Sequence, residues 1–211
     1  MLHIVELAYQ MNLKPVFAKL RIEGAVTRQR AAFDISFLHK RILAAGALDR
    51  LNEEARDIVY LLAETGLRPS EACNLDGATI QLDAPVPHVQ IRANQREMKT
   101  THSERDVPLV GIALEVTKRR PEGFPRYRHK ADSLSALVNK VLSSAGLLPT
   151  DDHSLYSLRH TFEDRLTAIE APEKVIATLM GHKWQRPKYE AGPSLEQKQH
   201  WLRRIAFSPT A

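Results

Sequence analysis

The chain has a single cysteine, Cys73, among its 211 residues. One cysteine excludes an internal disulfide and any zinc site that is built from several cysteines. The sequence also lacks an apolar run that is long enough to cross a membrane. Residues 1–10 have neither the basic start nor the small-residue cleavage site of a signal peptide. Together these absences predict a cytoplasmic protein without a membrane partner.

Positive charge is concentrated in one part of the chain. Residues 92–130 contain ten Lys and Arg against five Asp and Glu, so this segment carries the whole formal charge of +5. A localised basic surface is typical of a protein that binds a polyanion. The alternative is that Lys118–Arg120 forms only a solvated helix end. The candidate polyanion contacts are Arg92, Arg96, Lys118, Arg119, Arg120, Arg126, Arg128 and Lys130.

The length of the chain allows one sizeable core with a small appendage. Residues 1–30 hold one apolar stretch followed by a break at Pro15, which predicts an N-terminal helix and a linker. Residues 31–211 are denser in apolar positions and predict the main domain. We therefore expect one principal unit and a short N-terminal extension.

Cap residues mark several helices in the first half of the main domain. Asp34 can open a helix that has Ile35 on its apolar face, and Asn52 can open a second helix that ends at Gly66. Pro69 suits the first position of the next helix.

The period of apolar residues then changes from helical to alternating. Residues 79–82, 88–92 and 105–109 alternate as strands do, and Pro108 places the third strand at a sheet edge. Helical spacing follows in residues 111–119, 133–144 and 195–205. The sequence predicts a mainly helical domain with a small antiparallel β-sheet, an α+β fold.

The stretch from residue 155 to residue 189 predicts a short helical hairpin that carries polar residues. Arg159 and His160 precede an apolar repeat of helical spacing. Pro172 suits the first position of the second helix, and Gly181 its end, so His182 should follow a helix terminus.

Five residues of the chain suit chemistry on a phosphodiester. Arginine binds two phosphate oxygens with its planar fork, which fits Arg68 and Arg159. Lys99 can protonate a leaving oxygen, His182 can hydrogen-bond the phosphate, and Tyr189 can attack it. Each residue taken singly also fits an ordinary role, as a surface arginine, a packed histidine, a solvated lysine or a half-buried ring. The combination favours the chemistry.

Four sequence motifs occur here in one order. They are TGLRPSE, a KT…VPL turn, LRHTF, and LMGH followed by a tyrosine. In this respect the chain resembles the tyrosine recombinases, also called the phage integrase family, over roughly residues 31–207. The resemblance implies a mainly helical catalytic domain that cuts and rejoins DNA without a metal or another cofactor. It also implies a bacterial or phage-encoded, nucleoid-associated protein, with double-stranded DNA as the partner of the basic segment.

The resemblance assigns a role to each motif residue. Arg68 and Arg159 correspond to the two phosphate-binding arginines, and Lys99 to the turn lysine that acts as general acid. His182 corresponds to the late histidine. Tyr189 corresponds to the nucleophile, which forms a 3′-phosphotyrosyl link and releases a 5′-hydroxyl.

Other positions support the site or depart from the family pattern. Glu71 matches an acidic residue that supports the site without touching the phosphate. Tyr156 stands three residues before Arg159, where the family usually has His or Lys. With a reference pKa of about 10, a phenol is a poor base near neutral pH, so His160 or His153 could assist.

Two further departures concern chain length. The separation of seven residues between His182 and Tyr189 is shorter than usual in the family. Most members also carry an N-terminal domain that clamps the other face of the DNA, and residues 1–24 could be the end of such a domain. The C-terminal helix, whose apolar set is Leu195, Trp201, Leu202 and Ile205, is expected to mediate self-assembly on DNA.

Three other functions compete with recombination. A non-catalytic DNA-binding module derived from an integrase would use the same basic segment, but would not need the tyrosine. A metal-dependent nuclease would need clustered acids or histidines, and residues 151–153 form the only such cluster in the sequence. A type IB topoisomerase shares the chemistry, but the chain length and the LRHTF and LMGH motifs favour a recombinase.

Overall fold

A computed structural model describes residues 30–93, 104–182 and 192–208. Nearly all of the predicted N-terminal extension, together with Arg96, Lys99 and Tyr189, lies outside the described residues. No helix in the described ranges is long and apolar enough to cross a bilayer. The elements are α2 Ile35–Phe37, η1 Leu38–Ile42, α3 Glu53–Thr65, α4 Pro69–Ala72, β1 Ile80–Gln81, β2 His88–Ile91, β3 Arg105–Pro108, α5 Gly111–Arg119, η3 Pro125–Tyr127, α6 Ala131–Ser144, α7 Ser157–Ala168, α8 Glu173–Met180 and α9 Leu195–Ile205.

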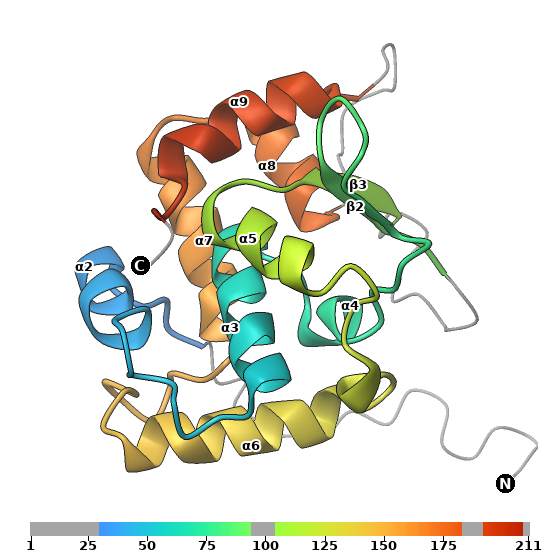
Figure 1. The fold of residues 1–211 in the computed structure, drawn as a ribbon. Helices are drawn as coiled ribbons and strands as arrows, with labels where there is room; N and C mark the ends of the chain where they lie inside the picture. The colour runs from blue at the N-terminus through green and yellow to red at the C-terminus, as the bar shows by residue number, and fades with distance from the viewer. Residues whose placement is uncertain (1–29, 94–103, 183–191, 209–211) are drawn as a thin grey trace, which may run out of the picture.

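Helix α3 forms the centre of the domain. Its start is the predicted one, because the Asn52 side chain accepts a hydrogen bond from the backbone N–H of Ala55, and acids occupy the first turn at the positive end of the helix dipole. Figure 1 shows α5 in front of α3, α7 behind it and α6 below it in this view. Most of its residues are buried, so α3 is a rigid support for the chain that leaves its C-terminal end.

The sheet lies beside this helical core. Its three antiparallel strands have the order β1-β2-β3, and Val89 of β2 lies opposite Val107 of β3. The predicted edge position of the Pro108 strand is confirmed, since β3 pairs only with β2 in this sheet. Helices α8 and α9 contact β3 (Figure 1). The predicted α+β fold is confirmed.

The first helix differs from its prediction. Asp34 caps it as expected, accepting a hydrogen bond from the N–H of Phe37. The helix then widens into a π-turn, in which the N–H of Leu43 bonds to the carbonyl of Leu38. Leu38 and Ile42 are fully buried, whereas Ile35, which was predicted on the apolar face, is 45% exposed. That prediction is wrong: Ile35 is the first residue of α2, at an end of the helix where Asp34 and Ser36 are exposed as well.

Helix α8 begins one residue later than predicted. Pro172 is the cap residue in an extended conformation, and the first helical residue is Glu173. The carbonyl of Pro172 accepts hydrogen bonds from the N–H groups of Val175 and Ile176, which a cap residue can do without an N–H of its own. The predicted stop at Gly181 is confirmed, with a left-handed φ of 63°.

Helix α9 packs against its own chain. Leu202 is fully buried, and the Lys198 ammonium donates to the carbonyl of Asp106 over 2.9 Å. Beyond the helix, three residues form what we call the C-terminal clasp: Glu64, Arg165 and Phe207. Arg165 pairs with Glu64 at 3.1 Å and lies 3.8 Å from the centroid of the Phe207 ring, while the backbone N–H of Phe207 donates to Glu64. The clasp fixes the segment after α9 to α3 and α7.

Candidate functional site

Arg68 occupies the link between α3 and α4. The link begins at Gly66, whose left-handed φ of 62° reverses the chain, and a Cβ there would overlap the ring of Phe162. Arg68 is the cap residue of α4, and its backbone N–H donates to Glu71 over 2.8 Å. Its Nη1 donates to the same carboxylate over 2.7 Å. Its Nε is buried and has no hydrogen-bond partner among the described residues, so this guanidinium keeps an unused donor.

Glu71 is the carboxylate around which the site is built. Its side chain is 4% exposed and accepts hydrogen bonds from Arg68 and from Arg105. Burial by itself would raise the pKa of Glu71. The hydrogen bond and charge of Arg105, together with Arg68, outweigh burial and lower that pKa to about 2. Glu71 is therefore a permanent anion near neutral pH, and it holds two cations in place.

The pH dependence of stability should reveal this anion. Because the folded pKa of Glu71 lies below its usual 4.5, its contribution is complete above pH 4.5 and is lost as the pH falls toward 2. Glu71→Gln should lower the free energy of unfolding at pH 7 by an amount on the order of 3 kcal/mol. The difference from the parent chain should shrink as the pH falls from 5 to 3 in urea unfolding measurements.

The control for this prediction is Glu173→Gln, which changes an exposed carboxylate at the start of α8. It should shift stability little at any pH, because an exposed charge is screened by water. A Glu71→Gln deficit that is equally large at pH 3 and pH 7 would contradict the assignment.

Arg159 lies in the first turn of α7 and is 3% exposed. Its Nη1 donates to the carbonyl of Gly66 over 2.5 Å, and its Nη2 donates to the carbonyl of Met180. It therefore joins the end of α3 to the end of α8. Burial, and then the positive charge of Arg68, lower the pKa of Arg159 to about 10. The guanidinium still stays protonated near neutral pH.

His182 follows the C-terminal end of α8, as predicted. Its side chain is 46% exposed, its Nε2 lies 3.5 Å from Nη2 of Arg159, and its Nδ1 lies 4.0 Å from the carboxylate of Glu163. Partial burial and the charge of Arg159 lower the pKa of His182, with Glu163 acting against them. The imidazole is therefore neutral at pH 7, next to two arginines and accessible to a ligand.

Arg105 belongs to this site and was not among the predicted site residues. Its side chain is 2% exposed, and its two terminal nitrogens donate to the two oxygens of Glu71 over 2.9 and 2.8 Å. The sequence contained a weak signal, because in an alternating strand Arg105 shares a face with the buried Val107. A charged residue at an inward position indicates a buried partner.

The supporting residues Tyr156 and His160 lie beside Arg159 at the start of α7. Their rings meet edge to face at 5.5 Å between centroids, and the guanidinium carbon of Arg30 lies 5.1 Å from the Tyr156 ring centroid. Arg30, Arg68 and Tyr156 line one cleft of about 320 Å³ with the N-terminal part of α6. Arg68 is the residue of the arginine cluster that lines this cleft.

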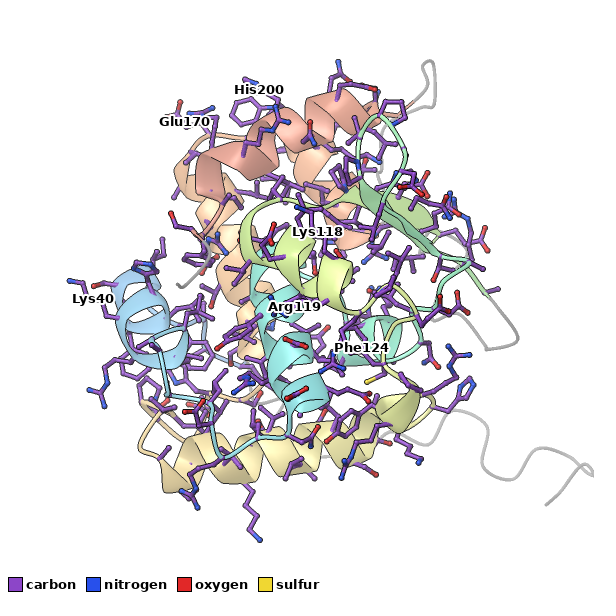
Figure 2. The ribbon with its side chains drawn as sticks, in the orientation of Figure 1. Lys40, Lys118, Arg119, Phe124, Glu170 and His200 are labelled. Carbon is purple, nitrogen blue, oxygen red and sulfur yellow. The ribbon has the colours of Figure 1, made fainter. Side chains whose placement is uncertain are left out.

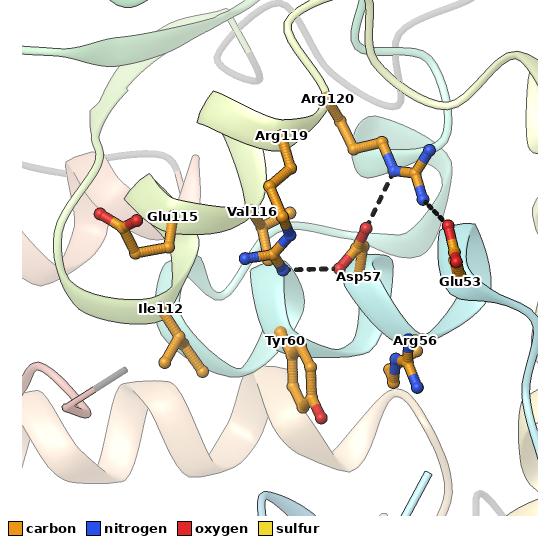
Figure 3. Close-up of a pocket in the computed structure, with 9 residues that line it drawn as sticks. All are labelled: Glu53, Arg56, Asp57, Tyr60, Ile112, Glu115, Val116, Arg119 and Arg120. Carbon is orange, nitrogen blue, oxygen red and sulfur yellow. Dashed lines mark hydrogen bonds and ion pairs between the residues drawn. The ribbon is translucent and has the colours of Figure 1, made fainter. Parts of the chain in front are cut away.

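Several of the predicted polyanion contacts are engaged by acids of the same chain. Arg119 and Arg120 both bind the buried carboxylate of Asp57, at 2.8 and 2.9 Å, and Arg120 also binds Glu53 (Figure 3). Lys118 and Arg119 project from the end of α5 (Figure 2). Two more of the predicted contacts are also paired with acids: Lys118 with Glu115 at 3.0 Å, and Arg92 with Asp106 at 2.5 Å.

The ion pairs of Arg119 and Arg120 line a separate pocket of about 380 Å³ (Figure 3). Asp57 lies near the start of α3, whereas Arg68 follows its end. At 1.5 Å per helical residue, Asp57 is roughly 12 Å along the axis from the end of α3 at Thr65. These cations are therefore not part of the arginine cluster, and their contact with a polyanion stays a prediction.

The remaining predicted contacts, Arg126, Arg128 and Lys130, are exposed. They lie on the segment that leads into α6, whose N-terminal residues line the cleft with Arg68. Within the described ranges no ion pair engages these three side chains. Among the described members of the predicted set, these three are the cations that no ion pair engages.

The chain segments that contain Lys99 and Tyr189 each adjoin a residue of the site. β2 and β3 are adjacent antiparallel strands with Ile91 opposite Arg105, so the connection between them, which includes Lys99, leaves the sheet next to Arg105. The connection that includes Tyr189 begins after His182. Both residues lie outside the described ranges, and their roles stay predictions.

Comparison with known proteins gives concordant results. The sequence model of the phage integrase family matches residues 38–186. The protein y4gC of Sinorhizobium fredii (strain NBRC 101917 / NGR234), named as an integrase/recombinase, is 29% identical over 181 residues, which cover 79% of this chain and 89% of y4gC.

Solved structures agree at the level of the fold. The integrase from mycobacterium phage Brujita superposes with a TM-score of 0.62 at 17% identity, covering 99% of this chain and 69% of the phage protein. The Tn1549 transposon integrase, solved in complex with circular intermediate DNA, gives a TM-score of 0.51 at 18% identity, covering 81% and 64%.

The helical domain with its small edge sheet has the fold of these solved phage and transposon integrases. The chain belongs to the phage integrase family, whose model covers well over half of it. Site-specific DNA recombination is the function that this membership supports.

Proposed function

We propose that this chain cuts and rejoins DNA itself, through a covalent link between Tyr189 and a 3′-phosphate. The observation that carries the proposal is the charge balance of the buried site. Among the described residues, three guanidinium groups, those of Arg68, Arg105 and Arg159, lie around one buried carboxylate, that of Glu71. A phosphodiester supplies the negative charge that this arrangement lacks, and Arg68 retains an unused donor for one of its oxygens.

In the cleavage step, one phosphorus–oxygen bond forms while another breaks, and religation is the reverse of this step. The Tyr189 hydroxyl gives its proton to solvent water as its oxygen attacks phosphorus, while the bond from phosphorus to the 5′ oxygen breaks. The leaving oxygen takes a proton from Lys99, which gives a 3′-phosphotyrosine and a 5′-hydroxyl. Attack by the 5′-hydroxyl of another strand reverses these steps, so no phosphodiester is lost and no external energy source is needed.

The described groups would act by charge and orientation. Arg68 and Arg159 bind the non-bridging oxygens, on which charge builds up in the transition state. His182, held neutral, donates a hydrogen bond to the same phosphate. Tyr156 supplies a hydroxyl beside Arg159, in place of the more basic side chain that is usual in the family.

Trapping on suicide substrates tests the proposal. A nicked duplex that carries a candidate attachment site loses its short 5′-hydroxyl fragment after cleavage, so the covalent protein–DNA product accumulates. We expect a product that resists denaturation and is removed by protease. Binding without any such product, across all candidate sites and in a longer protein that includes an N-terminal clamp, would favour the non-catalytic module.

The role of Lys99 can be isolated chemically. Lys99→Ala should cleave a normal substrate poorly, because the 5′ oxygen then leaves without a proton. It should recover on a substrate whose 5′ leaving oxygen is replaced by sulfur, since a thiolate needs no proton donor. The adduct yield on the two substrates measures this directly. Arg159→Lys is the control, because it should be slow on both, and equal slowness of Lys99→Ala on both would remove the general-acid role.

We further propose that the domain assembles with copies of itself on DNA through α9. The apolar side of the helix is used within the chain, so the surface that remains is the exposed side with Glu196, His200 and Arg203. Figure 2 shows His200 on the side that faces away from the core.

Charge reversal on that side tests the assembly. Arg203→Glu should reduce the number of protomers that sediment on a DNA fragment with two sites, and should leave thermal unfolding and single-site binding unchanged. Arg41→Glu, a reversal of an exposed arginine near α2, is the matched control. Equal assembly of both variants would place the contact elsewhere.

A further inference from the structure

We propose that Arg105 is a positioning residue of the site: it fixes the α4 group of Arg68 and Glu71 against the end of α8 that carries His182. The inference rests on the proposed function, because it concerns the alignment of groups that act on the phosphate. Three secondary-structure elements meet at the buried guanidinium of Arg105. Arg105 is the first residue of β3, Glu71 is on α4, and Leu179 is on α8.

On one side Arg105 holds the carboxylate that holds Arg68. Both Glu71 oxygens receive a terminal nitrogen of Arg105, at 2.9 and 2.8 Å, in the planar two-bond geometry that a lysine cannot reproduce. The same two oxygens receive Nη1 and the backbone N–H of Arg68, at 2.7 and 2.8 Å. A change in the angle of the Glu71 carboxylate therefore moves the Arg68 guanidinium.

On the other side Arg105 binds the end of α8. Its Nε donates to the carbonyl of Leu179 over 2.7 Å, and Arg159 donates to the next carbonyl, that of Met180. The last carbonyls of a helix have no partner within the helix, and a cation stabilises that end of the helix dipole. Two arginines thus bind successive carbonyls directly before Gly181 and His182.

The backbone at Gly181 lies against the Arg105 guanidinium. A Cβ built on Gly181 would be 2.8 Å from Nη1 and 3.1 Å from the guanidinium carbon of Arg105. The residue also has a positive φ of 63°, which an L side chain rarely adopts. The close approach sets where the chain turns into His182, so the position of the imidazole depends on Arg105 as well as on α8.

Burial excludes direct contact with DNA. The Arg105 side chain is 2% exposed, and its Nε and both terminal nitrogens donate to groups of the protein. Among the described residues, the groups through which Arg105 can act on the reaction are Arg68, by way of Glu71, and His182, by way of the end of α8. Loss of the fork geometry should misplace both groups by a fraction of an ångström, and such misplacement affects rate more strongly than binding.

The test compares two buried arginines. Arg165 matches Arg105 in burial, at 3% exposed, in pairing with a buried glutamate, and in donating to backbone carbonyls, but it belongs to the C-terminal clasp. Arg105→Lys and Arg165→Lys are made in the full chain. Thermal unfolding, DNA affinity and the rate of covalent product formation at saturating nicked DNA are measured, with the rate expressed per folded molecule.

We expect Arg105→Lys to bind DNA within about threefold of the parent chain and to form the covalent product ten- to a hundredfold more slowly, as roughly 1.4 kcal/mol corresponds to each factor of ten. Arg165→Lys should lose thermal stability and keep its rate per folded molecule. If both variants keep the rate, or if both lose it equally, Arg105 is only a structural residue. If the parent sequence forms no product on any candidate site, even in a longer protein with an N-terminal clamp, the proposed function is refuted instead, which separates the two failures.

A second variant decides the question if Arg105→Lys does not fold. Arg105→Ala leaves a cavity of guanidinium shape, which added methylguanidinium can occupy. We expect the rate of product formation by Arg105→Ala to rise with methylguanidinium, while the rate of Arg165→Ala per folded molecule stays flat. A gain in thermal stability without a gain in rate would overturn the positioning role.

Discussion

Tyr189→Phe should abolish the covalent protein–DNA product. The substitution removes one oxygen atom, the atom that becomes bonded to phosphorus, and no other hydroxyl of the chain is expected to replace it. Folding and DNA affinity should stay close to those of the parent chain, because the aromatic ring is retained. The measurement is the yield of denaturation-resistant complex on nicked DNA, together with the dissociation constant from equilibrium binding.

Two other tyrosines serve as matched controls. Tyr156→Phe removes the hydroxyl beside Arg159, and should slow the reaction without preventing formation of the product. Tyr127→Phe removes a hydroxyl that hydrogen-bonds to Asn52, and should affect stability alone. Peptide mapping of the parent complex should place the nucleotide adduct between Lys188 and Glu190. An adduct on Tyr127 or Tyr156 would overturn the assignment of the nucleophile.

Arg159→Lys should bind DNA almost normally and cleave it at least a hundredfold more slowly. Lysine keeps the positive charge but loses the fork that reaches a phosphate oxygen while also bonding to Gly66 and Met180. When one hydrogen-bond donor to the negative charge of a transition state is removed, the activation free energy rises by about 3 kcal/mol. We expect the same loss for Arg68→Ala, measured as the single-turnover cleavage rate at saturating DNA.

The control is an arginine on the surface. Arg126→Ala should weaken DNA binding and reduce its salt dependence by about one counterion, and should leave the rate at saturating DNA unchanged. A surface arginine such as Arg126 should therefore affect DNA affinity, whereas a buried arginine such as Arg159 should affect the cleavage rate. An Arg159→Lys chain that is folded and cleaves at the parent rate would exclude Arg159 from phosphate binding.

Local signals predicted the elements of this fold well. Asp34, Asn52, Gly66 and Gly181 act through hydrogen bonds and dihedral angles within a few residues of themselves, so their roles were visible in the sequence. Arg68, Arg159 and His182 meet in the structure because each follows or begins such an element. The prediction for Ile35 was wrong because helical spacing does not indicate whether the first turn of a short helix reaches the core, and here residues 34–36 are exposed.

Long-range pairing explains what the sequence did not reveal. Arg105 meets Glu71 across 34 residues and Leu179 across 74, and no spacing rule connects such positions. The same is true of Arg119 and Asp57, which are 62 residues apart. The sequence therefore predicted a basic segment correctly, but did not reveal which of its cations are neutralised by acids of the same chain.

The C-terminal clasp has a consequence for the order of synthesis. The backbone N–H of Phe207 reaches Glu64 across 143 residues, and Arg165 reaches it across 101. At 5–20 residues per second, a ribosome finishes Phe207 roughly seven to thirty seconds after Glu64. Burial raises the pKa of Glu64 even with Arg165 and the Phe207 N–H beside it, so burial without these partners would cost more free energy. We therefore expect the end of α3 to stay hydrated during translation, so that the neighbouring site is completed only after the last residues are made.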